Sequence, residues 1–283
     1  MSRLIYDIGA HFGEDTAYYL HCGYHVIAVE ANPELCDYIR KRFVKELSDK
    51  KLVLIESAVT IESKTEVSFF VSEHTGESSM YEGRLKQAGV NYREIKVSTI
   101  SLNELFLRHG KGFYCKIDIE GGDIPVLKSL GPYDNLPEYF SVEICGLPIG
   151  ELIGQPSQLI VPVTEFERLG YTKFKLIDQF SLTTLRRKSY YSMQRNILFR
   201  TGNKILKTLK IREKHLNPRN WYSKKYNYSF TNDTSGPFAE DLLGSWSSGE
   251  KIKNMISKHF KEYYKVERSK KNNIFWVDLH ASR

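Results

Sequence analysis

The sequence predicts an α/β fold with a doubly wound, mostly parallel sheet of seven strands, and three observations support it. An apolar strand that begins at Leu4 runs straight into the turn Asp7-x-Gly9-x-x-x-Gly13. A second apolar run, 25–29, ends in an acid, Glu30. Strand and helix patterns then keep alternating, and repeated strand–helix units form mostly parallel sheets with helices on both faces.

The individual elements follow from the hydrophobic pattern. Asn32 and Pro33 are a suitable N-cap and first residue for the second helix. The segment 65–72 alternates like a strand, and we expect it to pair with 92–100 as an added β element. The main sheet is expected to contain a strand from residue 4 and strands 25–30, 52–55, 113–118, 139–144, 171–177 and 274–279. The expected helices are 15–22, 33–48, 102–109, 123–130, 157–169 and 248–263.

The chain of 283 residues is long enough for one large α/β domain with an elaboration. We expect a cofactor-binding core over 1–179, an insertion over 180–245, and a C-terminal helix and strand over 246–283 that complete the core sheet. The four cysteines lack metal-ligand spacing, which favours reduced thiols in a cytosol-like compartment. Because the first strand begins too early for a signal peptide and no apolar stretch matches a membrane span, we expect a soluble, cytoplasmic protein.

The net charge of +7 is concentrated in one basic, aromatic segment. Residues 180–230 contain thirteen Lys and Arg against one acid, Glu213, so this segment carries +12 and the rest of the chain sums to −5. Its aromatic residues include Tyr190, Tyr191, Phe199, Trp221, Tyr222, Tyr226, Tyr228 and Phe230. Such a cap could bind an anionic or lipid-linked glycan, because aromatic faces stack on sugars and Arg or Lys bind phosphate. Nucleic acid, an anionic membrane surface or a merely solvated cap fits the same composition.

The turn after the first strand predicts a site for an adenosine-containing cofactor. Gly9 and Gly13 allow a tight turn and a close approach of ligand to backbone. Glu30 follows where an acid accepts hydrogen bonds from both ribose hydroxyls. A dinucleotide turn would have glycine in place of Asp7, whose carboxylate repels a pyrophosphate but attracts the ammonium of an amino acid. S-adenosylmethionine therefore fits where NAD does not; the alternative is a turn that is tight only for packing.

Acids also end the fourth and fifth strands, at the edge of the sheet where ligands bind. If these two strands are neighbours they lie ~4.8 Å apart, and Asp118 and Glu143 could then share one pocket. Lys116, Asp118 and Glu120 share one face while the strand stays extended. A carboxylate can orient a hydroxyl and accept its proton during methyl transfer, and paired carboxylates could instead hold a divalent cation, although no metal site is indicated. Structural roles stay open, because Glu120 can stabilise a helix start and Lys116 can neutralise Asp118. His11 could be a base or a local hydrogen-bonding residue.

These segments resemble the FkbM-type family of S-adenosylmethionine-dependent methyltransferases. The matching pieces lie between residues 4 and 145: the first turn, 29–33, Glu77-Ser78-Ser79, 97–102, and Lys116-Ile117-Asp118-Ile119-Glu120-Gly121. The family usually has Asn in place of His11. The resemblance implies a Rossmann-like class I methyltransferase fold with the adenine beside Ser57 and Ala58 and the methionine end near Asp118. It also implies O-methylation, commonly of sugars or other hydroxylated natural products.

We therefore expect an S-adenosylmethionine-dependent O-methyltransferase that acts on a hydroxyl of a sugar or glycan. The expected cofactor-binding residues are Asp7, Gly9, His11, Gly13, Glu30, Ala31, Ser57, Ala58, Ser79 and Asp118. The expected catalytic residues are Lys116, Asp118, Glu120 and Glu143. A nucleic-acid methyltransferase is one alternative, weakened because the chain lacks the Asn/Asp-Pro-Pro-Tyr/Phe signature of amino-group methylation on bases. A non-catalytic binding module is another, although it would have no need of Asp7 and Glu30.

Overall fold

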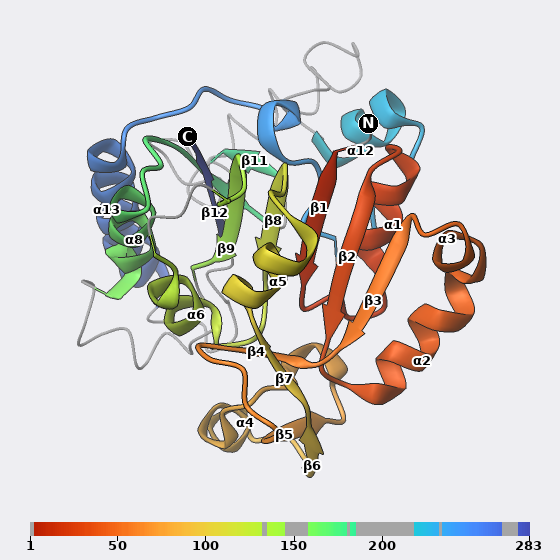
Figure 1. The fold of residues 1–283 in the computed structure, drawn as a ribbon. Helices are drawn as coiled ribbons and strands as arrows, with labels where there is room; N and C mark the ends of the chain where they lie inside the picture. The colour runs from red at the N-terminus through yellow and green to blue at the C-terminus, as the bar shows by residue number, and fades with distance from the viewer. Residues whose placement is uncertain are drawn as a thin grey trace.

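The main sheet has the predicted doubly wound α/β architecture (Figure 1). The computed structural model describes residues 3–131, 135–144, 158–179, 182–184, 218–231, 234–267 and 277–283. From one edge to the other the strands are β3 (Leu52–Glu56), β2 (His25–Glu30), β1 (Leu4–Ile8), β8 (Tyr114–Ile117), β9 (Tyr139–Glu143), β12 (Val277–Ser282), β10 (Lys173–Asp178) and β11 (Thr183–Thr184). The strands from β3 to β9 are parallel, and β12 is antiparallel to both its neighbours. Each of the seven predicted strands has a counterpart, and β11 adds a two-residue strand at the edge.

Helices cover both faces of this sheet, whose central strands bury side chains on both sides. The helices are α1 (Glu14–His21), α2 (Pro33–Arg42), α3 (Val44–Ser48), α4 (Glu82–Ala88), α5 (Leu102–His109), α6 (Asp123–Ser129), α8 (Val161–Arg168), α12 (Pro218–Tyr226) and α13 (Gly249–Glu267). One face packs on α5, α6, α8 and α13 through residues such as Phe106 and Phe166. The other packs on α1 and on the C-terminal segment that contains Tyr222 and Phe238. Figure 1 shows α13 and α8 at one end of the sheet and α2 and α3 at the other.

The predicted single helix over 33–48 is wrong, because the chain breaks between α2 and α3. The N-cap is as expected: the Asn32 side chain accepts a 3.0 Å hydrogen bond from the Glu34 amide. Phe43 leaves the helical conformation, with φ −117° and ψ 38°. Its buried ring packs so closely against Gly13 that a Cβ there would lie 2.7 Å from it. Packing of this aromatic ring against the glycine turn accounts for the break.

Two other helices differ from expectation. The predicted helix 157–169 is a 3-10 turn, η2 (Gln158–Ile160), followed by α8, since Pro162 suits only the first turn of a helix. The helix α4 was not predicted, because seven residues are too few to show a clear helical period. It ends at Gly89, whose left-handed φ of 69° stops it.

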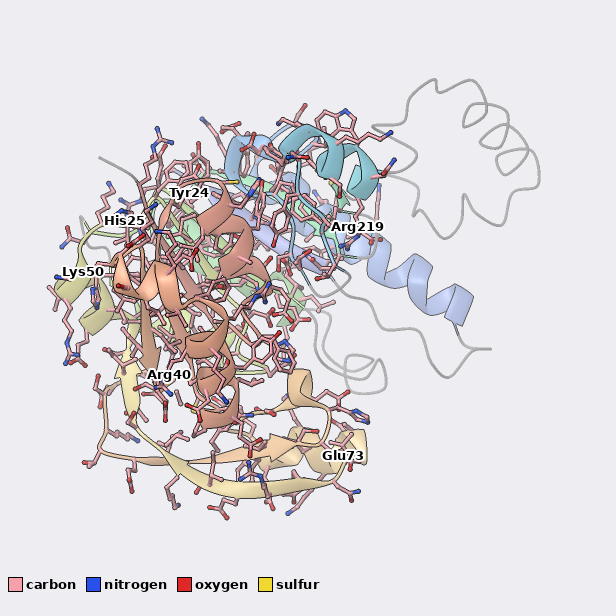
Figure 2. The ribbon with its side chains drawn as sticks, turned by 90° about the vertical axis from the view of Figure 1, so that its right-hand side faces the viewer. Tyr24, His25, Arg40, Lys50, Glu73 and Arg219 are labelled. Atoms are coloured by element: carbon pink, nitrogen blue, oxygen red, sulfur yellow. The ribbon has the colours of Figure 1, made fainter. Side chains whose placement is uncertain are left out.

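Two small sheets extend the domain at the carboxyl ends of the central strands. The strand β5 (Val67–Ser72) pairs antiparallel with β6 (Tyr92–Val97), which confirms the predicted added element. The strand β4 (Ala58–Thr60) pairs in parallel with β7 (Thr99–Ser101). These sheets and α4 lie below the main sheet in Figure 1. In Figure 2, Glu73 marks this lower end and Arg219 of α12 lies at the opposite, upper end.

Most of the basic segment 180–230 lies outside the described residues, as do Tyr190, Tyr191 and Phe199. Three of its thirteen basic residues are described, all on α12. The Arg219 guanidinium donates to the carbonyl of Gln179 at 3.1 Å and to that of Thr231. These hydrogen bonds connect α12 to neighbouring segments of the same chain. Residues 274–276 of the last predicted strand are also outside the described residues. Among the described helices, none is long and apolar enough to cross a membrane.

Candidate active site

A cavity of about 250 Å³ opens at the carboxyl ends of β1, β2, β3 and β8. Seven of the residues expected at the cofactor line it: Gly9, His11, Glu30, Ala31, Ser57, Ala58 and Asp118. Lys116 and Glu120 of the expected catalytic set line it as well. The strand order β8-β1-β2-β3 places Asp118 on one side of the glycine turn, and Glu30 and then Ser57 on the other. A ligand that crosses the cavity would meet these three residues in series.

The glycine turn brings the end of β1 directly against Asp118. Gly9 has a left-handed φ of 81°, and a Cβ there would lie 1.8 Å from the Asp118 carbonyl oxygen. The amides of Gly9 and Ala10 both donate to the Val29 carbonyl, at 2.9 and 3.1 Å. Gly13, with φ 75°, begins α1 and packs on Phe43 outside the cavity lining. Gly9 therefore shapes the site directly, and Gly13 contributes through packing.

Glu30 is a buried carboxylate held from two sides by the backbone. Its Oε2 accepts from the His11 amide at 2.9 Å, and its Oε1 accepts from the Asn32 amide at 2.8 Å. Each carboxylate oxygen has further acceptor capacity, which is available on the side that lines the cavity. Burial raises the pKa of Glu30 above its ordinary value, while the two amide hydrogen bonds oppose that rise.

His11 sits in the turn with a left-handed φ of 53°. Its Nδ1 lies 3.3 Å from Glu14 Oε1, and its backbone amide donates a hydrogen bond to the Glu30 carboxylate. Burial favours the neutral ring, yet the hydrogen bond and charge of Glu14 and the charge of Glu30 raise the pKa of His11 overall. The local hydrogen-bonding role is therefore present in the structure.

Lys116 is a buried ammonium between two acids. Its Nζ lies 2.9 Å from Asp15 Oδ2 and 3.1 Å from Asp118 Oδ2. Burial alone would lower the pKa of Lys116, but Asp15, Asp118 and Asp7 together raise it well above its ordinary value. Lys116 consequently carries a fixed positive charge and is not available as a base.

Asp7 lies beneath the turn and outside the cavity lining. The Thr16 hydroxyl donates to its Oδ2 at 2.5 Å, and its Oδ1 has no hydrogen-bond partner in the described part of the chain. Burial raises the pKa of Asp7 to about 7, with Lys116 opposing and Asp15 adding to the rise. Direct contact between Asp7 and a cofactor stays a prediction.

Glu120 occupies a strained turn after β8, with φ 51°. Its carboxylate forms an ion pair with Arg84 of α4, and its carbonyl accepts a 2.7 Å hydrogen bond from the Ser79 hydroxyl. Burial and the charge of Asp118 raise the pKa of Glu120 to about 8, although Arg84 lowers it. Ser79 lies outside the cavity lining, where Ser78 and Met80 contribute instead. Ser79 and Arg84 thus fasten the added β element to the turn that carries Glu120.

Three carboxylates converge beyond this turn. Asp118, Glu120 and Glu143 each place an oxygen within 4.8 Å of the others, a spacing that could hold a cation. The fourth and fifth expected strands, β8 and β9, are neighbours in the sheet, and this pairing brings Glu143 beside Asp118. Glu143 itself is outside the cavity lining and is in register with Asp278 on β12. Burial and then the charges of the neighbouring acids raise the pKa of Glu143 well above its ordinary value.

Residues 7–172 match the model of the methyltransferase FkbM domain family. The chain belongs to this family. The match begins at the glycine turn and includes Glu30 and the cluster of three carboxylates, so the resemblance stated from these motifs is confirmed. No curated protein sequence matches the chain.

Solved methyltransferase structures resemble this FkbM methyltransferase distantly. A precorrin-6y C5,15-methyltransferase from Geobacter metallireducens is 14% identical, with 62% of this chain and 69% of that one covered and a TM-score of 0.33. A SAM-dependent methyltransferase from Geobacter sulfurreducens, solved with S-adenosyl-L-homocysteine, is 12% identical, with 100% and 85% covered and a TM-score of 0.36. One from Thiobacillus denitrificans, also with S-adenosyl-L-homocysteine, is 12% identical, with 100% and 86% covered and a TM-score of 0.36.

The cavity is also lined by residues outside the expected cofactor-binding and catalytic sets. They are Ala10, Glu14, Asp15, Val29, Leu35, Val59, Phe69, Gly76, Ser78, Met80 and Ile119. Asp15 lies two positions after Gly13, the last residue of the glycine turn, so its carboxylate was visible in the sequence. Phe69 and Met80 have the apolar pattern of ordinary core residues. Arg84, the partner of Glu120, lies 36 positions before it in the sequence. Asp278, the register partner of Glu143, lies on the last strand. No local sequence pattern connects either residue to the site.

Proposed function

We propose that this FkbM methyltransferase transfers a methyl group from S-adenosylmethionine to a hydroxyl of a sugar or another polyhydroxylated acceptor. The observation that carries the proposal is the convergence of the Asp118, Glu120 and Glu143 carboxylates within 4.8 Å of one another, at the end of a cavity that Asp118 and Glu120 line. Membership of the family supports methyl transfer. Carboxylates that can orient a hydroxyl and accept its proton support oxygen as the acceptor atom.

The cavity fits this cofactor. When bound, S-adenosylmethionine would supply an electrophilic methyl group on a sulfonium ion. Glu30 offers free acceptor capacity for ribose hydroxyls, and apolar Leu35, Phe69 and Met80 suit a base. Acids such as Glu14 and Asp118 also line the cavity, and they would repel a pyrophosphate but attract cationic groups.

The order of the strands supports a place for the acceptor. Glu30 and Ser57 lie on the β2 and β3 side of the glycine turn, so the adenosine part is expected there. The opposite side leads from Asp118 to Glu143 and then to Asp278, because β9 and β12 follow β8 in the sheet. We place the reacting hydroxyl at Asp118, with the rest of the acceptor toward Glu143.

The residues on this side are suited to a polyhydroxylated molecule. An ionised carboxylate accepts hydrogen bonds from hydroxyls, and a protonated carboxyl also donates one. The pKa of Glu120, raised to about 8, keeps both of its forms accessible near neutral pH, and burial raises the pKa of Glu143 well above its ordinary value. An ionised member of the cluster would take the hydroxyl proton, while Lys116 stays charged beside Asp118. These acids disfavour a polynucleotide phosphate next to the reacting atom.

An acceptor could still carry an anionic or lipid-linked part away from the reacting hydroxyl. For that part we propose the basic segment 180–230 as the contact, because its charge of +12 offsets the acidic site. Its described helix, α12, lies at the end of the molecule opposite the added β element (Figure 2), so Lys224 and Lys225 are not assigned to this contact. Peripheral contact with an anionic membrane would use the same basic segment.

The test is a methyl-transfer assay with the full chain, labelled S-adenosylmethionine and a panel of acceptors. The panel contains free sugars, nucleotide-linked sugars, diphosphate-lipid-linked sugars and RNA. We expect label in an O-methyl group of a sugar, identified by mass spectrometry and NMR. Label transferred to RNA and not to any sugar would refute the proposed acceptor class.

A further inference from the structure

Asp15 joins two parts of the chain that are far apart in sequence. It is the second residue of α1 and is 4% exposed. Its carboxylate accepts from the Ser235 amide, at 3.0 Å to Oδ1 and 3.2 Å to Oδ2. The same carboxylate lies 2.9 Å from Lys116 Nζ. The buried Asp15 carboxylate therefore contacts both the C-terminal segment, through the Ser235 amide, and Lys116 of the site.

Lys116 is gripped by Asp15 on one side and by Asp118 on the other, at 2.9 and 3.1 Å. An ammonium has three donors on a flexible stem, so its position depends on its partners. Without the Asp15 carboxylate, Asp118 alone of these two acids would hold the Lys116 ammonium, and its position beside Asp118 would be less well defined. The charged groups that face Lys116 come from several elements: Asp7 on β1, Asp15 and Glu14 on α1, Asp118 after β8, Asp278 on β12, and His11 in the glycine turn.

Ser235 belongs to a segment that is built into the site. Thr234 and Ser235 are 2% and 7% exposed. The Ser235 amide donates to Asp15. Burial raises the pKa of Asp278, the register partner of Glu143, and the Ser235 side chain opposes that rise. Phe238 stacks on Tyr114 of β8, with ring centroids 4.5 Å apart and an interplanar angle of 10°. The segment 234–238 thus meets the acceptor side of the sheet through buried polar and aromatic contacts.

We infer that Asp15 is a positioning residue of the methyl-transfer site, which holds Lys116 beside Asp118 and fastens segment 234–238 to the acceptor side. This inference rests on the proposed function. It assigns Asp15 an effect on turnover that acts through Lys116, and it makes a segment some 220 positions later in the chain part of the site.

The main test is Asp15→Asn in the full chain. Asparagine keeps an oxygen for the Ser235 amide and removes the charge that holds Lys116. We expect kcat to fall roughly 10- to 100-fold, because small displacements in a site are costly, and the Kd of S-adenosylhomocysteine to rise by a smaller factor, since Asp15 also lines the cavity. The rising limb of the pH profile of kcat/KM should move to lower pH, because the acids that remain lose a negative neighbour. Asp37→Asn on the exposed surface of α2 is the matched control and should behave as the wild type.

A purely structural role for Asp15 gives a different result. Asp15→Asn would then lower the melting temperature while kcat of the folded enzyme and its pH profile stayed as in the wild type, and that outcome would overturn the inference. Hydrogen exchange of the wild-type protein provides a test that needs no variant. The Ser235 amide, which donates to Asp15, should exchange as slowly as those of β8, and rapid exchange of this amide would refute the fastening of the segment.

Failure of the inference is distinguishable from failure of the proposed function. The wild type is assayed first on hydroxyl acceptors. A wild type that methylates no hydroxyl refutes the proposed function, and the exchange experiment still decides whether 234–238 is fastened. A wild type that is active, with Asp15→Asn equal to it in kcat and pH profile, refutes the positioning role alone.

Discussion

The His11 amide donates a 2.9 Å hydrogen bond to the Glu30 carboxylate, so the turn after β1 orients the acid at the tip of β2. The Asn32 amide holds the other oxygen at 2.8 Å. Both donors depend on local conformation: His11 is left-handed, and Asn32 is the N-cap of α2. The carboxylate is thereby fixed before any ligand arrives, which lowers the entropic cost of binding.

Substitution Glu30→Gln should weaken the binding of S-adenosylhomocysteine. The amide group of Gln would face either the His11 or the Asn32 amide with a donor, which leaves a buried donor unpaired. The expected loss is about 2–3 kcal/mol, roughly 30- to 150-fold in Kd. Calorimetric titration measures it, and Glu34→Gln, a substitution of an exposed acid on α2, is the control. Unchanged affinity would remove Glu30 from the cofactor site.

Substitution Gly9→Ala should destabilise the protein far more than Gly23→Ala. Both glycines are left-handed, with φ 81° and 85°, so both substitutions carry the same backbone strain of about 1–2 kcal/mol. A Cβ on Gly23 meets nothing within 4 Å, whereas one on Gly9 would lie 1.8 Å from the Asp118 carbonyl oxygen. The steric clash should cost a further 1–3 kcal/mol, roughly as overpacking of a core does. Urea unfolding compares the two, and equal losses would contradict the close contact between turn and Asp118.

The sequence was most informative where a short pattern places residues together. Parallel strands bring their carboxyl ends to one edge, so Glu30, Asp118 and Glu143 could be assigned to that edge from their strand tips alone. The glycine turn could also be predicted from the sequence, because Gly9 has a backbone conformation that few other residues adopt.

Contacts between distant segments could not be predicted in the same way. Asp278 reaches Glu143 only because β12 inserts antiparallel between β9 and β10. Arg84 looks like a solvated charge on a short helix, and only the docking of α4 brings it to Glu120. The break at Phe43 depends on the packing of its ring against Gly13, which a helical period does not record.

Substitution Asp118→Asn should lower kcat more than it lowers cofactor affinity. Asn keeps the size of the side chain but loses the charge that orients a hydroxyl and pairs with Lys116. A loss of roughly 100-fold or more in kcat is expected for a group that assists proton transfer. Single-turnover kinetics and titration with S-adenosylhomocysteine separate the two effects, with Asp49→Asn on the surface as control. Normal turnover would exclude Asp118 from catalysis.

Activity should persist after treatment with EDTA. Lys116 already pairs with Asp118, and Arg84 with Glu120, so two of the three clustered carboxylates have cationic partners from the protein. Proton acceptance by a carboxylate then requires no metal. The measurement is turnover in EDTA compared with turnover in added Mg²⁺ or Mn²⁺. Loss of activity that either metal restores would instead assign the cluster to a divalent cation.

The rate should increase with pH as the carboxylate cluster loses its shared proton. Burial and the charge of Asp118 raise the pKa of Glu120 to about 8, so the cluster is partly protonated at neutral pH and gains its proton-accepting form as the pH rises. A rising limb of kcat/KM near this value is expected. Arg84 lowers the pKa of Glu120, so Arg84→Met should move the limb to higher pH. Arg93→Met, which removes an exposed ion pair with Glu34, should leave it in place. A kcat/KM that does not change from about pH 6 to 9 would show that the cluster does not accept the proton. This pH range lies well above the pKa of an ordinary carboxylate.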